Sequence, residues 1–212
     1  MENNTPKPLR SIAQLVSYIF HPLFIPTFFM LYLMKVIPFE FVGITDWQLK
    51  MRLFSVFWLT AFFPAFAVFL LWRLKFSDSI FLRTQKERVI PYVITMFFYW
   101  WMYYLSRNFS DQPLALKFFY FGIFIASSLG LIVNNFIKVS LHAMGVSGLL
   151  MAIVLVSFYY PINNFIWVAA AAVLAGIVVS ARMIVSDHTR QELIIGFAIG
   201  IFTQLMAYFW VL

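Results

Sequence analysis

The sequence predicts an all-α, polytopic transmembrane helical bundle of six to seven spans, and composition is the main reason. Of the 212 residues, 63% are hydrophobic and only 11% are charged, whereas an ordinary soluble domain is about 25% charged. The mean hydropathy is +0.89, and 27 Phe, 10 Tyr and 7 Trp supply the aromatic side chains that membrane interfaces favour. This composition excludes soluble globular, disordered, fibrous and disulfide-stabilised proteins.

A helix needs about 20 apolar residues to cross the hydrocarbon core of a membrane. Seven stretches bounded by charged residues or proline meet this requirement: 12–37, 53–72, 89–105, 116–137, 141–160, 165–185 and 193–212. Pro22 and Pro26 interrupt the first stretch, which predicts a kinked or partly re-entrant helix. Since no long linker separates the stretches, we expect residues 1–212 to form one domain with a polar N-terminal tail at 1–10.

The lack of cysteine and the thin spread of positive charge exclude several kinds of site. Without Cys there are no disulfides, thiolate metal ligands or thiol nucleophiles. The 15 Lys and Arg against 8 Asp and Glu give a net charge of +7, but no basic run or soluble basic domain offers a nucleic-acid site. The cations suit loop anchoring and anionic lipid headgroups. The isolated Asp residues do not supply the Asp-rich metal motifs that a prenyltransferase would require. We expect no metal and no cofactor.

Alternating spans place most of the cations on one membrane face. The N-terminus and the segments 73–88, 138–142 and 180–192 all reach this face. It receives Lys7, Arg10, Arg73, Lys75, Arg83, Lys86, Arg88, Lys138, Arg182 and Arg190, whereas the other face receives Lys35, Lys50, Arg52, Arg107 and Lys117. The count favours a cytoplasmic position for the richer face. Cations that bind a ligand do not report topology, however, so the orientation stays open.

The richer face also receives His142, His188, Ser140 and Glu192, a set that suits a phosphate ester. A guanidinium group can bind two phosphate oxygens at once. One imidazole can attack phosphorus while another protonates the leaving oxygen. Arg182 stands six residues before His188, and Glu192 follows it by four. If His188 begins the last helix, this spacing puts the ring and the carboxylate on one helix face. Ser140 and His142 open another span, where free N–H groups favour phosphate.

These residues resemble the type 2 phosphatidic acid phosphatase (PAP2) superfamily, whose motifs are KxxxxxxRP, PSGH and SRxxxxxHxxxD. The third motif is matched by Arg182 and His188, with Glu192 in place of the family's Asp and Ala181 in place of its Ser. The second is similar to Val139-Ser140-Leu141-His142, which keeps Ser and His but lacks Pro and Gly.

The first motif is the most changed. Arg83 takes the place of the family's Lys and Pro91 keeps the Pro, but Ile90 replaces the Arg, so Lys86 or Arg88 must supply that cation. Two spans separate this segment from His142, whereas membrane members of the family keep the first two motifs on one side of a single loop. The resemblance covers residues 83–192.

The resemblance implies a metal-independent phosphatase that acts on a lipid phosphate such as phosphatidic acid or undecaprenyl pyrophosphate. The size of the chain and its lack of cysteine favour a bacterial inner membrane. His188 is expected to be the nucleophile that forms a phosphohistidine, with Glu192 orienting it and His142 acting as general acid. The residues expected to hold the phosphate oxygens are Arg182, Ser140, Arg83, Lys86 and Arg88.

Two other functions stay open. The changed motifs fit a catalytically decayed relative that binds a lipid phosphate or partner helices. A small transporter fits less well, because the charged residues gather at one face and not near the middle of the bilayer. Among single residues, Lys138 is interpreted as a snorkelling anchor, His21 as part of a helix kink, and 97–104 as an interfacial aromatic belt. The sequence does not predict the oligomeric state.

Overall fold

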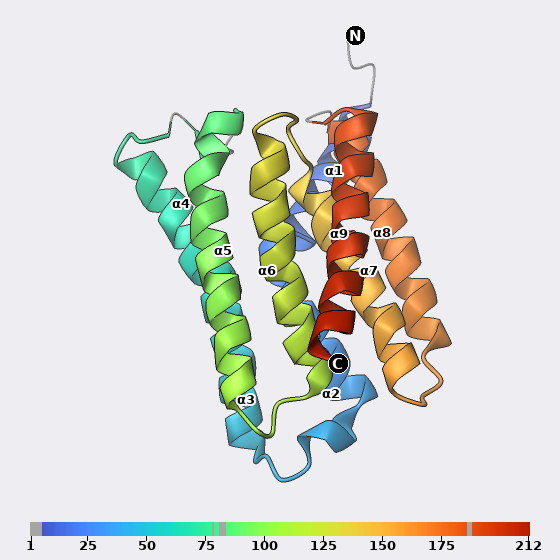
Figure 1. Ribbon diagram of the computed structural model, residues 1–212. Coiled ribbons are helices and arrows are strands. Elements are labelled where there is room, and N and C mark those ends of the chain that lie inside the picture. Colours follow the sequence, from blue (N-terminus) through green and yellow to red (C-terminus); the bar gives the residue numbers. More distant parts are fainter. Residues whose placement is uncertain (1–5, 78, 81–83, 186–187) are drawn as a thin grey trace.

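A computed structural model describes residues 6–77, 79–80, 84–185 and 188–212. The regular secondary structure within these residues is entirely helical, which confirms the predicted all-α class. The chain runs up and down one bundle (Figure 1). Its elements are α1 (Lys7–Ile19), η1 (Pro22–Phe24), α2 (Ile25–Val36), η2 (Pro38–Phe41), α3 (Asp46–Phe57), η3 (Trp58–Phe62), α4 (Phe63–Arg73), α5 (Gln85–Asn108), α6 (Leu114–Asn134), α7 (Leu141–Tyr159), α8 (Phe165–Val185) and α9 (Arg190–Val211).

The bundle has two ends, which we name by the termini that lie there. The N-terminal face carries the starts of α1, α5, α7 and α9 and the ends of α4, α6 and α8 (Figure 1). The C-terminal face carries the end of α9. The segments that the sequence analysis assigned to the cation-rich face therefore meet at the N-terminal face, as far as their residues are described.

The first pass is broken where the sequence predicts a kink. The helix α1 ends at Ile19, His21 precedes the short η1, and α2 resumes at Ile25. Pro22 has no N–H to donate, so the α-helical ladder cannot continue through it. The start of α1 differs from the prediction, because the helix begins at Lys7 and includes the last part of the expected polar tail.

Three helices begin three to seven residues before the apolar stretches that predict them. Each is preceded by a threonine whose hydroxyl accepts a backbone N–H, while the residue three positions on bonds back to the threonine N–H. These capping boxes pair Thr45 with Gln48, Thr84 with Glu87, and Thr189 with Glu192. Capping satisfies the otherwise unpaired N–H groups of a first turn. Helical structure therefore extends into polar sequence that a search for apolar stretches leaves out.

Among the described residues, six passes are long and apolar enough to cross a membrane, so the chain is an integral membrane protein by the length and composition of its helices. The six are Lys7–Val36, Asp46–Arg73, α6, α7, α8 and α9. The helix α5 has 24 residues, about 36 Å at the α-helical rise, and lies alongside α4 and α6 (Figure 1). Its Tyr- and Trp-rich second half makes it less apolar. Whether α5 crosses decides between six and seven spans.

The helix α7 is the most buried pass, and glycines on α9 allow the two helices to approach closely. A Cβ on Gly196 would lie 2.6 Å from the carbonyl oxygen of Ser140, and one on Gly200 would overlap the Ser147 hydroxyl and the Met144 carbonyl. Two glycines four residues apart make this kind of contact between membrane helices. The glycines therefore fix how near the start of α9 lies to the start of α7.

We predict that Gly200→Ala destabilises the bundle by about 1–3 kcal/mol, because the added methyl group must push α7 away from α9. Gly176→Ala is the matched control, since Gly176 is also helical and nothing lies within 4 Å of the place that an added methyl group would take. Thermal unfolding in detergent should give a lower midpoint for Gly200→Ala and an unchanged or slightly higher one for Gly176→Ala. Equal midpoints for the two variants would contradict the close contact.

Single cysteines can show whether α5 crosses the membrane, because the chain has none of its own. We expect Lys86→Cys to react with an impermeant maleimide from the same side of sealed vesicles as Lys7→Cys. Asn108→Cys, at the other end of α5, should react from the opposite side, together with Lys50→Cys. Labelling of positions 86 and 108 from one side would show that α5 does not span.

Candidate functional site

The candidate site lies at the N-terminal face, where several chain segments meet. It takes side chains from the start of α5, the connection between α6 and α7, the end of α8 and the start of α9. Two hydrogen bonds to backbone carbonyls join the α6–α7 connection to the starts of α9 and α5. The Ser140 amide donates to the Glu192 carbonyl at 3.3 Å, and the Arg88 guanidinium donates to the Val139 carbonyl at 3.1 Å.

His188 and Glu192 form the predicted pair. The Nδ1 atom of His188 lies 2.8 Å from the Glu192 carboxylate, and the His188 side chain is only 3% exposed. The same carboxylate oxygen accepts the Thr189 N–H at 3.2 Å as part of the capping box. A carboxylate can only accept, so Nδ1 carries the proton, and Nε2 of the neutral ring keeps its lone pair. The capping box thus holds the carboxylate that sets the tautomer of the histidine.

Burial is the main cause that lowers the pKa of His188 to about 4, and the positive charges of Arg88, Arg182 and Lys138 lower it further. The hydrogen bond to Glu192 acts in the opposite direction and raises the pKa. The ring is consequently neutral at pH 7, although cations lie around it. A neutral imidazole with a free Nε2 lone pair is the form that can attack phosphorus.

The charges of three cations act on His188, and these cations come from three parts of the chain. Arg88 and Arg182 are both buried, with 9% of each residue exposed, and Lys138 lies in the α6–α7 connection. Arg88 and Lys86 are the two candidates for the missing cation of the first motif. The charge of Arg88 lowers the pKa of His188, whereas Lys86 is exposed at the start of α5. Arg83, predicted to bind phosphate, lies outside the described residues.

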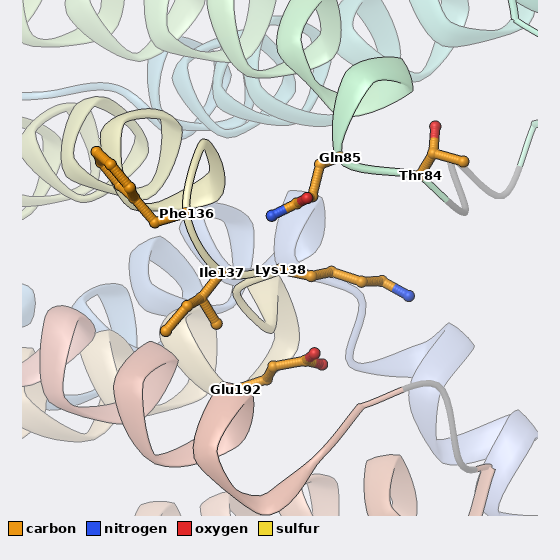
Figure 2. Close-up of a pocket in the computed structure, with 6 residues that line it drawn as sticks. All are labelled: Thr84, Gln85, Phe136, Ile137, Lys138 and Glu192. Atoms are coloured by element: carbon orange, nitrogen blue, oxygen red, sulfur yellow. The ribbon is translucent and has the colours of Figure 1, made fainter.

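Lys138, which the sequence analysis interpreted as a membrane anchor, also lies near the candidate site. Its charge lowers the pKa of His188, and it lines a pocket together with Glu192. The only signal in the sequence was its position two residues before Ser140. Figure 2 shows the Lys138 and Glu192 side chains extending in the same direction from neighbouring segments.

The pocket beside the histidine pair has a volume of about 500 Å³. It is lined by Thr84, Gln85, Phe136, Ile137, Lys138 and Glu192. Gln85 projects into it from α5, across from Lys138 and Glu192 (Figure 2). Phe136 and Ile137 form an apolar side, and the other residues form a polar side. A ligand with a polar head and an apolar tail matches these two sides.

Ser140 lies in the predicted place, but some of its groups are engaged within the protein. Its amide donates to the Glu192 carbonyl, and its buried hydroxyl oxygen accepts the Ala143 N–H at 3.4 Å as the cap of α7. The tight contact between α7 and α9 explains the first bond. The amide is therefore not directed to a ligand in this conformation, and only the hydroxyl hydrogen remains to donate.

His142 lies deeper than His188, against the kink in the first pass. Its Nε2 lies 3.0 Å from the Ser17 carbonyl, and its ring packs edge-on against His21, with ring centroids 5.2 Å apart. Because a carbonyl only accepts, Nε2 carries a proton. If His142 is a general acid, Nδ1 must deliver the proton, and the ring must first become an imidazolium.

His21 lies in the kink of the first pass, where the sequence analysis placed it. The kink is present, and the Nδ1 atom of His21 accepts the Leu23 N–H at 3.4 Å. Its ring nevertheless touches His142, and the charge of Arg182 acts on His21, His142 and His188. A pattern of apolar stretches carries no signal for a contact between residues 121 positions apart.

No family model, curated protein or solved structure matches this chain. Within the described residues, no three His, Asp or Glu side chains are grouped to hold a metal ion.

We predict that His188 stays neutral well below pH 6.5 in the folded protein. Nuclear magnetic resonance of isotope-labelled histidine in detergent can follow its ring, with His188→Gln to assign the signal among three histidines. The folded-state pKa of about 4 lies below the ordinary 6.5, so the unfolded chain binds the proton first. His188 therefore favours folding above pH 6.5, and this contribution is lost as the pH falls toward 4. Titration of His188 near pH 6.5 would contradict the prediction.

Proposed function

We propose that this protein hydrolyses a lipid phosphate or prenyl pyrophosphate through a phosphohistidine on His188, in a membrane that we expect to be the bacterial inner membrane. The observation that carries the proposal is the buried His188–Glu192 pair, in which the bond from Nδ1 to the carboxylate leaves the lone pair on Nε2, together with three cations whose charges act on the ring. The resemblance of the third motif to the PAP2 superfamily supports the same chemistry.

In the proposed reaction, Nε2 of His188 attacks phosphorus and the bond from phosphorus to the leaving oxygen breaks. Arg88, Arg182 and Lys138 stabilise the negative charge on the remaining phosphate oxygens. Glu192 compensates the positive charge that the ring acquires. His142 is the candidate donor of a proton to the leaving oxygen, and water then hydrolyses the phosphohistidine. The apolar side of the pocket, at Phe136 and Ile137, would contact the lipid next to its headgroup.

A second candidate is binding of a lipid phosphate without turnover. Two contacts favour it: the Ser140 amide is used by Glu192, and Nε2 of His142 is used by Ser17. Both groups have assigned roles in the hydrolytic reaction, and both would have to change partner or act through another atom.

The test is phosphate release by the purified protein in detergent from phosphatidic acid, phosphatidylglycerophosphate and undecaprenyl pyrophosphate, with a chelator present. We expect metal-independent turnover that His188→Ala abolishes. Glu192→Gln should retain the fold but lower turnover by about 100- to 10,000-fold, because the ring loses its orienting charge. The rate should fall as the pH drops toward 4, where His188 becomes protonated.

Arg182→Gln and Arg10→Gln form a matched pair of controls. Arg182 is buried beside the histidines, whereas Arg10 is exposed on α1 at the same face. Loss of activity only in Arg182→Gln, with thermal midpoints near wild type, would assign the effect to the site. Wild-type protein that is inert on every substrate but binds these lipids through Arg182 would favour the binding function and reject the hydrolase.

A further inference from the structure

The C-terminal face contains a pocket that plays no part in the site described above. It has a volume of about 460 Å³ and lies where the end of α5, the start of α6 and the end of α9 meet. Its lining residues are Tyr103, Arg107, Leu114, Lys117, Trp210 and Val211. The pocket lies at the end of α9, whereas the candidate site lies at the start of that helix, at the opposite end of the bundle (Figure 1).

The lining carries two positive charges and no carboxylate. Within the described part of the chain, neither Arg107 nor Lys117 forms an ion pair. The Arg107 guanidinium lies over the Tyr103 ring, 5.8 Å from its centroid. A cation held on an aromatic ring in this way keeps its full charge.

None of the three carboxylates of this face lines the pocket. The sequence places five basic and three acidic residues there. Asp111, the acidic residue nearest to Arg107 and Lys117 in sequence, forms an ion pair with Arg52. Glu40 interacts with Tyr160, and Asp46 lies in the first turn of α3. The charges of Lys117 and Asp111 attract each other, but the carboxylate of Asp111 already forms its ion pair with Arg52.

The aromatic side chains at the pocket indicate the depth at which it lies in the membrane. Trp210 is 75% exposed, and the Phe121 ring lies between it and Tyr103, with centroid distances of 6.3 and 4.6 Å. Trp and Tyr gather at the headgroup level of membranes, where an apolar body and a polar tip are both satisfied. The cations therefore lie where phospholipid headgroups lie, and the apolar Leu114 and Val211 line the same space.

We propose that this pocket binds the headgroup of an anionic phospholipid in the leaflet opposite to the candidate site. The phosphate lies between Arg107 and Lys117, and the indole N–H of Trp210 is a further donor at its rim. The ligand is a lipid because the charged end of the pocket adjoins apolar side chains that face the membrane. This site does not depend on the proposed phosphatase activity.

The test measures how many phosphatidylglycerol molecules the purified full-length protein retains in native mass spectrometry, with phosphatidylcholine as the zwitterionic comparison. Wild type should retain phosphatidylglycerol in preference to phosphatidylcholine. Arg107→Gln/Lys117→Gln should weaken that retention by about 10- to 30-fold, because two interfacial cations are lost. Lys35→Gln/Lys50→Gln is the matched control, since it removes the same charge from exposed positions on the same face, and it should retain the lipid as wild type does.

Further arms separate the possible outcomes. Arg107→Lys/Lys117→Arg keeps both charges and should bind within about threefold of wild type; the single Lys117→Gln variant replaces the double variant if the latter does not purify as a folded species. Glycerol phosphate tests for a soluble ligand. If the protein retained glycerol phosphate as well as it retains phosphatidylglycerol, a lipid site would be overturned. Equal losses in the pocket variant and in the Lys35/Lys50 variant, or no loss in either, would overturn the proposal.

Discussion

The close approach of α9 to α7 is the constraint on which the candidate site depends. Gly196 and Gly200 have no side chains, so the backbone of α9 lies directly against Ser140, which caps α7, and against Met144 and Ser147 within α7. That contact brings the Glu192 carbonyl to the Ser140 amide. A larger residue at either glycine would separate the helices, and it would also separate the His188–Glu192 pair from the α6–α7 connection that carries Lys138.

At the N-terminal face, the positive charges of Arg88, Arg182 and Lys138 all act on the neutral ring of His188. Arg88 and Arg182 are both largely buried here, and the Arg88 guanidinium donates to the Val139 carbonyl. The same cations disfavour protonation of His188 and so preserve its lone pair. This electrostatic environment is the basis of the proposal that the site acts on a phosphate group.

The sequence predicted much of the fold but placed some helix boundaries incorrectly, for one physical reason. Apolar stretches mark the part of a helix inside the hydrocarbon core, whereas capping boxes at Thr45, Thr84 and Thr189 mark where the helix starts. These threonine signals were present in the sequence. The Gly196–Gly200 spacing was also present, and it indicates where α9 packs closely against a neighbour.

By itself, the sequence determined the membrane class, the sharing of one face by the polar segments, and the His188–Glu192 pair, because hydropathy, alternation and helical periodicity are local properties. Only the tertiary structure decided which cations reach His188, why Arg88 and not Lys86 does so, and that His21 packs against His142. It also decided that the Ser140 amide is used within the protein. These contacts join residues tens of positions apart, and their geometry follows from helix packing, which no local pattern encodes.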